Sequence, residues 1–151
     1  MVRILLTGCL GRMGRMITEM SGSIGEIEIV EGVDQNAAGA KDVPYPVRTS
    51  LKECDREADV LVDFSNAGLL YEITEFMDEK GIPAVLCATG YDEAQLEAVK
   101  NISVKCAVLR SSNMSIGINL ITGILEEISG KLISAGFDCE IVEKHHNQKL
   151  D

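Results

Sequence analysis

The sequence has no tryptophan, and aromatic residues make up only 4% of the chain. The core must therefore be aliphatic, and a hydrophobic fraction of 46% is sufficient for a globular fold. No apolar run reaches the roughly 18 residues that a membrane-spanning helix needs, and the N-terminus lacks a signal-peptide pattern. We therefore expect a cytoplasmic protein with no membrane association.

Basic residues are also scarce: 14 Lys and Arg stand against 24 Asp and Glu, giving a net charge of −10. No basic cluster is long enough to follow a phosphate backbone, so nucleic acid is not an expected partner. The five cysteines include no C-x-x-C pair, so no zinc site or other metal site is predicted. Four of them adjoin apolar runs and are expected to be reduced and mostly buried: Cys9, Cys87, Cys106 and Cys139.

Short apolar runs alternate with helical patterns along most of the chain. The runs predict strands at 2–7, 26–34, 47–49, 58–65, 82–90 and 104–110. They lack strict alternation, which is typical of a parallel sheet covered on both faces. The helical patterns include Met13, Met16, Ile17 and Met20 on one face, a helix ending at Gly81, and one opened by Asp92 and Gln95. Residues 1–114 are therefore predicted to form an α/β domain, a Rossmann-like doubly wound parallel sheet.

After residue 114 the pattern changes. Apolar residues from Leu120 to Leu132 line one helix, and 137–146 alternates as a strand of an antiparallel sheet does. We interpret residues 115–151 as the incomplete beginning of a second, α+β domain.

The stretch GCLGRMG places Gly8, Gly11 and Gly14 between a strand and a helix. A helix N-terminus attracts phosphate, and glycines let the backbone approach it. Arg12 adds a possible charge-assisted bond to a phosphate. The stretch therefore indicates a dinucleotide-binding turn; a purely structural turn is the alternative.

Asp34 lies 20 residues beyond Gly14, at the end of the second predicted strand. A carboxylate there can accept both hydroxyls of an adenosine ribose and repels a 2′-phosphate. This favours NADH over NADPH, with a surface turn residue as the alternative. Thr89 and Asn113 follow two further strands and can bond a nicotinamide, or serve only as turn and cap residues.

The two histidines, His145 and His146, are adjacent, and Lys149 follows. Neighbouring residues on a strand face opposite ways, so they do not easily share a metal. The pattern indicates a histidine that acts as an acid/base group beside Lys149, a cation that can hold a carboxylate. A solvated basic patch is the alternative.

The segments GRMG, VDFS, ATGYDE, SSNMSIGIN and EIVEKHHNQKLD, in this order, resemble the dihydrodipicolinate reductase family from residue 2 to the last residue. The resemblance implies NAD(P)H-dependent reduction of 4-hydroxy-tetrahydrodipicolinate, a cyclic dicarboxylate, in lysine and diaminopimelate biosynthesis. It implies that residues 115–151 begin a substrate-binding and oligomerisation domain. It also implies a homotetramer for the complete chain, and we expect the 151-residue chain alone to lack full activity.

The family's functional residues match by position. His145 corresponds to the acid/base histidine, Lys149 to the proton-donating lysine and His146 to a substrate-binding histidine. The cofactor-contacting positions are Gly8, Cys9, Leu10, Gly11, Arg12, Met13, Asp34, Cys87, Ala88, Thr89, Ser111, Ser112, Asn113 and Met114. Another nicotinamide-dependent dehydrogenase and a non-catalytic dinucleotide-binding module are the alternatives.

Overall fold

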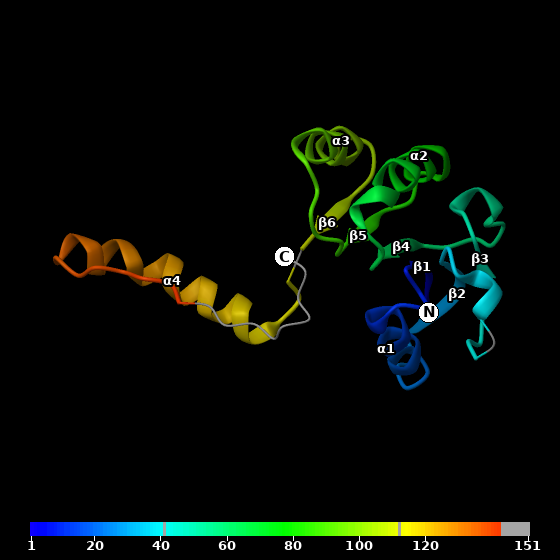
Figure 1. The fold of residues 1–151 in the computed structure, drawn as a ribbon, viewed down its shortest axis with the longest axis horizontal. Coiled ribbons are helices and arrows are strands. Elements are labelled where there is room, and N and C mark those ends of the chain that lie inside the picture. Colours follow the sequence, from blue (N-terminus) through cyan, green and yellow to red (C-terminus); the bar gives the residue numbers. More distant parts are fainter. Residues whose placement is uncertain (41, 112, 143–151) are drawn as a thin grey trace. The chain divides into compact units, whose positions relative to one another are not determined.

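The computed structural model describes residues 1–40, 42–111 and 113–142. The chain divides into two compact units, Met1–Ser112 and Asn113–Asp151. Within the described residues, the first unit is a six-stranded, all-parallel sheet of order β3-β2-β1-β4-β5-β6 (Figure 1). Its strands are β1 (Val2–Thr7), β2 (Ile27–Val33), β3 (Val47–Arg48), β4 (Val60–Asp63), β5 (Ala84–Leu86) and β6 (Val108–Arg110). The predicted Rossmann-like doubly wound sheet is confirmed.

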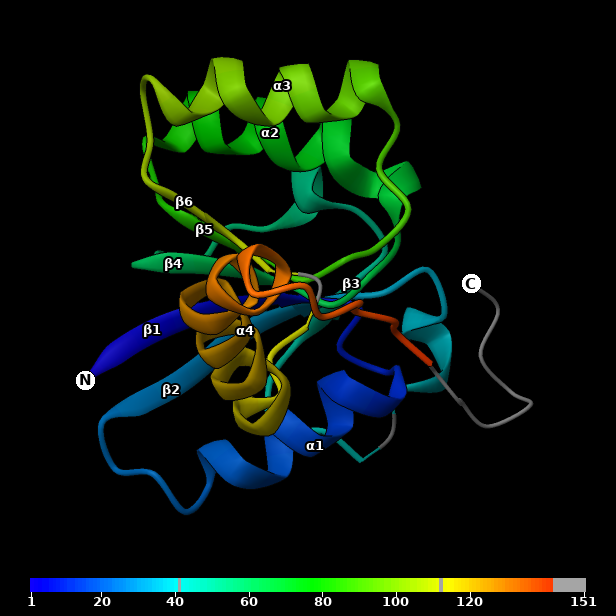
Figure 2. The same ribbon diagram turned by 90° about the vertical axis from the view of Figure 1, so that its left-hand side faces the viewer.

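Helices cover both faces of this sheet. The helix α1 (Arg12–Ser21) lies on one face, and α2 (Leu70–Lys80) and α3 (Glu93–Ser103) lie on the other (Figure 2). The core on the α2 and α3 side is mainly aliphatic, as the scarcity of aromatics predicted, and its fully buried members include Leu5, Leu61, Leu70, Ile73, Met77 and Leu86. A smaller cluster on the other face contains Ile4, Leu6, Cys9, Ile29 and Tyr45.

Local signals set the ends of two helices as predicted. Asp92 and Gln95 form a capping box at the start of α3, and Gly81 ends α2 in the left-handed conformation, with φ of +67°. The predicted strand at 104–110 begins only at Val108. The reason is that the N–H groups of Lys105 and Cys106 still bond the Ile102 carbonyl oxygen at the end of α3.

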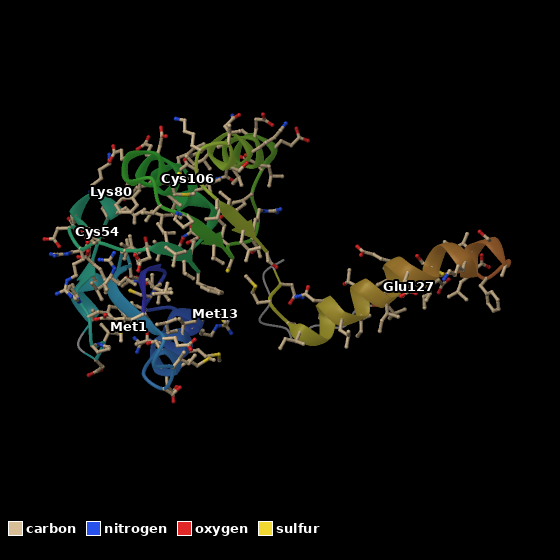
Figure 3. The ribbon with its side chains drawn as sticks, turned by 180° about the vertical axis from the view of Figure 1, so that it is seen from behind. Met1, Met13, Cys54, Lys80, Cys106 and Glu127 are labelled. Atoms are coloured by element: carbon tan, nitrogen blue, oxygen red, sulfur yellow. The ribbon has the colours of Figure 1, made fainter. Side chains whose placement is uncertain are left out.

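The apolar face of α1 is only partly buried against the rest of the protein. Met13, Met16 and Met20 remain 43%, 53% and 52% exposed, and Figure 3 shows Met13 on this helix. The only buried residue of α1 is Gly14. Close approach at this glycine therefore sets how the helix meets the sheet.

In the second unit, α4 (Ile116–Ser134) begins at Ser115, whose hydroxyl accepts a hydrogen bond from the Ile118 N–H. The strand predicted at 137–146 is wrong for residues 137–142, which have no strand, and its remainder lies outside the described residues. Alternation alone does not make a strand, because a strand needs a neighbour to bond, and the described part of this unit supplies none.

Four cysteines are buried free thiols: Cys9, Cys54, Cys87 and Cys106; Figure 3 labels Cys54 and Cys106. Cys139 is exposed, which corrects the expectation that it would be buried. Its burial was expected because it adjoins an apolar run, but the neighbouring residues Phe137 and Ile141 are themselves exposed. No helix of the described residues is both long enough and apolar enough to cross a bilayer.

Candidate functional site

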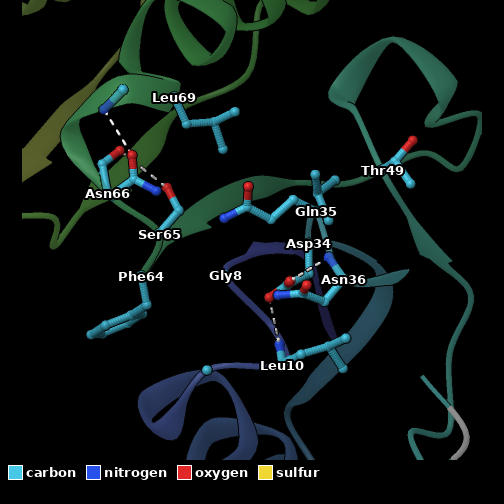
Figure 4. A pocket seen from close by; sticks show the side chains of 13 residues that line it. Gly8, Leu10, Asp34, Gln35, Asn36, Thr49, Phe64, Ser65, Asn66 and Leu69 are labelled. Atoms are coloured by element: carbon cyan, nitrogen blue, oxygen red, sulfur yellow. Dashed lines mark hydrogen bonds between the residues drawn. The ribbon is translucent and has the colours of Figure 1, made fainter. Parts of the chain in front are cut away.

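A pocket of about 430 Å³ opens at the carboxyl edge of the sheet (Figure 4). Its lining comes from the segments that follow β1, β2, β3 and β4, and comprises Gly8, Leu10, Gly11, Val33, Asp34, Gln35, Asn36, Thr49, Phe64, Ser65, Asn66, Gly68 and Leu69. In an open α/β sheet, ligands bind where the strand order reverses, outside the carboxyl ends of the strands. Here that point lies between β1 and β4, and the pocket lies at this point.

The glycine turn is packed too tightly for other residues. Gly8 has φ of +70°, and a Cβ there would lie 2.5 Å from the Phe64 carbonyl oxygen. A Cβ on Gly14 would overlap the Gly8 carbonyl oxygen and lie 2.6 Å from the carbonyl carbon of Cys9. Strand, turn and helix therefore approach one another at distances that only glycine allows.

The N-terminus of α1 is open to an anion. The first N–H bonded within the helix belongs to Arg15, which donates to Gly11 at 3.0 Å, so the N–H groups of Arg12 and Met13 precede the intrahelical bonds. The N-cap residue, Gly11, makes no side-chain cap, and the first turn holds no acidic residue. The start of α3, by contrast, is closed by its own capping box. The positive end of the α1 dipole therefore faces no competing carboxylate in that turn.

Asp34 lines the pocket and also braces the glycine turn. One carboxylate oxygen accepts the Leu10 N–H at 3.1 Å, and the other accepts the Asn36 N–H at 2.9 Å (Figure 4). Each oxygen of a carboxylate has a second lone pair, so ribose hydroxyls can still donate to it. Among the described residues, none that lines the pocket is Lys or Arg.

The predicted cofactor residues near the glycine turn have three kinds of surroundings. Gly8, Leu10, Gly11 and Asp34 line the pocket. Cys9 lies buried under the turn, where burial and the nearby Asp34 raise the pKa of its thiol to about 12, so it stays protonated at neutral pH. Arg12 and Met13 are exposed in the first turn of α1.

Of the other predicted residues, the described ones in the first unit, at 87–89 and 111, are outside the lining of this pocket. Cys87 and Ala88 are buried and Thr89 is exposed in the loop after β5, and burial raises the pKa of the Cys87 thiol to about 11. Ser111 is half-buried, and Asn113 and Met114 belong to the second unit. Ser112, His145, His146 and Lys149 lie outside the described residues. No metal-binding cluster of three His, Cys, Asp or Glu side chains occurs in the part of the chain that the structure describes.

The sequence reasoning missed several lining residues, notably Thr49, Asn66, Gly68 and Leu69. A usable signal exists for one of them. Asn66 directly follows VDFS and caps the short helix Ala67–Leu69 by accepting the Gly68 N–H at 2.9 Å. A capping residue after a predicted strand marks a loop at the ligand edge.

Comparison with known proteins gives consistent matches. The family model described as dihydrodipicolinate reductase, N-terminus, matches residues 2–114. The 4-hydroxy-tetrahydrodipicolinate reductases of Clostridium tetani and Caldanaerobacter subterraneus subsp. tengcongensis are 45% and 38% identical over the whole chain. The chain spans 58% of the length of each of these relatives.

Among solved structures, the dipicolinate-bound dihydrodipicolinate reductase from Paenisporosarcina sp. TG-14 matches with a TM-score of 0.74 and 24% identity, covering 100% of this chain and 60% of that one. The myo-inositol 2-dehydrogenase from Lactobacillus plantarum matches with a TM-score of 0.66 and 12% identity, covering 85% of this chain and 42% of that one. At these identities the two structures support the fold.

Proposed function

The chain belongs to the dihydrodipicolinate reductase family, and on that premise we propose that it supplies the dinucleotide-binding part of an NAD(P)H-dependent 4-hydroxy-tetrahydrodipicolinate reductase. The reaction is the formation of tetrahydrodipicolinate in lysine and diaminopimelate biosynthesis. The observation that carries the proposal is that the glycine turn and Asp34 line one pocket, and that the turn leads directly into the uncapped start of α1.

The chemistry of this pocket suits a dinucleotide. The Arg12 and Met13 N–H groups, which precede the intrahelical bonds, are donors for a diphosphate, and glycine at position 11 lets the backbone approach it closely. The Asp34 oxygens are acceptors for the adenosine ribose hydroxyls. A reduced nicotinamide, when bound, supplies the hydride for the reaction.

The charges around Asp34 support a preference for NADH. A 2′-phosphate would meet the Asp34 carboxylate, with Gln35, Asn36 and Thr49 as neutral neighbours in the lining. Because no described lining residue offers a compensating cation, we propose that NADH binds more tightly than NADPH.

The proton chemistry is proposed from the family resemblance alone. His145 would act as the acid/base group, Lys149 would donate a proton and His146 would bind the substrate. Imidazole and ammonium groups suit these roles because they can carry a proton and a positive charge near neutral pH.

A titration of the 151-residue chain with NADH and with NADPH tests the proposal, with nicotinamide fluorescence as the signal. We expect saturable binding of both, with the lower Kd for NADH. Repeating the NADH titration in the presence of pyridine-2,6-dicarboxylate tests whether a dicarboxylate binds the same chain. A changed Kd for NADH would support dicarboxylate binding. If neither nucleotide binds, the proposed function is wrong.

A further inference from the structure

Asp63, the last residue of β4, is a buried carboxylate that the proposed chemistry does not use. Its exposed fraction is 0%, and in the sheet it pairs with Thr7 of β1 and Leu86 of β5. No salt bridge among the described residues involves it. A buried carboxylate without a cation is strongly destabilising unless hydrogen bonds satisfy it. Its hydrogen-bond partners therefore explain its presence.

Neutral donors from three separate segments converge on this carboxylate. One oxygen accepts the Thr7 hydroxyl at 2.6 Å, and both the N–H and the hydroxyl of Ser65, at 3.0 Å and 2.5 Å. The other oxygen accepts the Tyr91 hydroxyl at 3.4 Å. Burial and the Asp63 charge raise the pKa of Tyr91 above its usual value, so this phenol remains a donor at neutral pH.

Each donor belongs to a segment of the proposed cofactor site. Thr7 directly precedes Gly8 of the glycine turn, and Ser65 lines the pocket. Tyr91 closes the loop that carries the predicted cofactor residues 87–89. Backbone hydrogen bonds also connect these segments. The Phe64 N–H donates to the Thr7 carbonyl oxygen at 3.0 Å, and the Cys87 N–H donates to the Asp63 carbonyl oxygen at 2.9 Å.

We propose that Asp63 is a positioning residue for the dinucleotide, whose carboxylate holds the glycine turn, the 64–66 loop and the 87–91 loop in one arrangement before the ligand binds. This inference rests on the proposed function of the pocket. A carboxylate offers about four acceptor sites, whereas an Asn amide offers fewer and introduces N–H donors. Asparagine therefore fits the space but cannot satisfy the same set of donors.

The test is the Kd for NADH of the Asp63→Asn chain, measured well below the Tm of every variant compared. We expect the Kd to rise about tenfold, because charge-assisted bonds are replaced by weaker neutral ones and the loops must be ordered on binding. In the free protein, we expect faster amide hydrogen exchange at Ser65 and in the glycine turn.

Glu31→Gln is the matched control. Glu31 is also a fully buried carboxylate, but it accepts from Arg48 at 2.7 Å and from the Arg56 N–H at 3.3 Å, and neither residue lines the pocket. We expect this variant to lower the Tm and leave the Kd for NADH unchanged. A purely structural Asp63 would behave in the same way.

A lower Tm with an unchanged Kd for Asp63→Asn would overturn the inference and leave the proposed function intact. If the wild-type chain binds no NADH, the proposed function fails and this inference fails with it. Should Asp63→Asn not fold, Thr7→Val deletes one donor with nearly the same shape. We expect a several-fold rise in Kd for it, and an unchanged Kd would overturn the inference.

Discussion

Replacing Gly8 with alanine should damage both the fold and the pocket. Two separate effects combine at this position. An L-residue held at φ of +70° costs roughly 1–2 kcal/mol. The new Cβ would also lie 2.5 Å, 2.6 Å and 2.7 Å from backbone atoms of Phe64 and Ser65, and such overpacking costs about 1–3 kcal/mol.

The two effects together predict that Gly8→Ala lowers the free energy of unfolding by roughly 2–5 kcal/mol. That is a large part of the about 5–15 kcal/mol available to a typical domain. Relief of the clash must move backbone rather than a flexible side chain, so the 64–66 loop would shift within the pocket lining. We therefore also expect a higher Kd for NADH.

Three other glycines separate the two effects in urea unfolding experiments. Gly25→Ala meets no atom within 4 Å and should change stability little, whereas Gly81→Ala, at φ of +67° in open space, isolates the conformational cost. Gly14→Ala isolates the clash with Gly8 and Cys9. If Gly8→Ala destabilises no more than Gly81→Ala, the close packing of the turn is refuted.

The other predictions concern charge and exposure. For Asp34→Ala, we expect the NADH-to-NADPH affinity ratio to fall about tenfold; neither nucleotide should bind as tightly as NADH binds the wild type, because the brace on the Leu10 N–H is also lost. If the variant bound NADPH more tightly than the wild type binds NADH, the bracing role of Asp34 would be contradicted. Hydrogen bonds from the Arg3 side chain and N–H lower the pKa of Asp59 from 3.8 to about 2. Because the folded state favours the ionised form, this stabilisation is complete above pH 3.8 and is lost as the pH falls toward about 2. The stability difference between wild type and Asp59→Asn in urea should therefore shrink over that range, and a constant difference would refute the argument. Because Cys139 is the exposed thiol and the other four are buried, a thiol reagent should label it first, and Cys139→Ser should remove the fast phase; a fast phase that persists would contradict the described burial.

The order and type of the elements in the first unit follow from local sequence signals. Apolar runs without strict alternation predicted the parallel strands. The capping box at Asp92 predicted the start of α3, and Gly81 predicted the end of α2. The glycine spacing and the position of Asp34 predicted that both would lie at one edge of the sheet, and the structure brings them to one pocket.

The features that sequence reasoning missed depend on contacts between distant segments. Residues 137–142 alternate as a strand does, but a strand also needs a partner to bond. The donors to Asp63 include Thr7, which is 56 residues away in sequence, so no local pattern indicates their convergence. The methionines of α1 follow helical spacing, but the residue of this helix that packs against the turn is Gly14. A pattern of apolar side chains does not reveal this contact, because glycine has no side chain.

The most direct test of the account is a crystal structure of the chain grown with NADH. We predict diphosphate oxygens within hydrogen-bonding distance of the Arg12 and Met13 N–H groups, and adenosine ribose hydroxyls on the Asp34 carboxylate. Coenzyme density at any other place on the molecule would contradict the account.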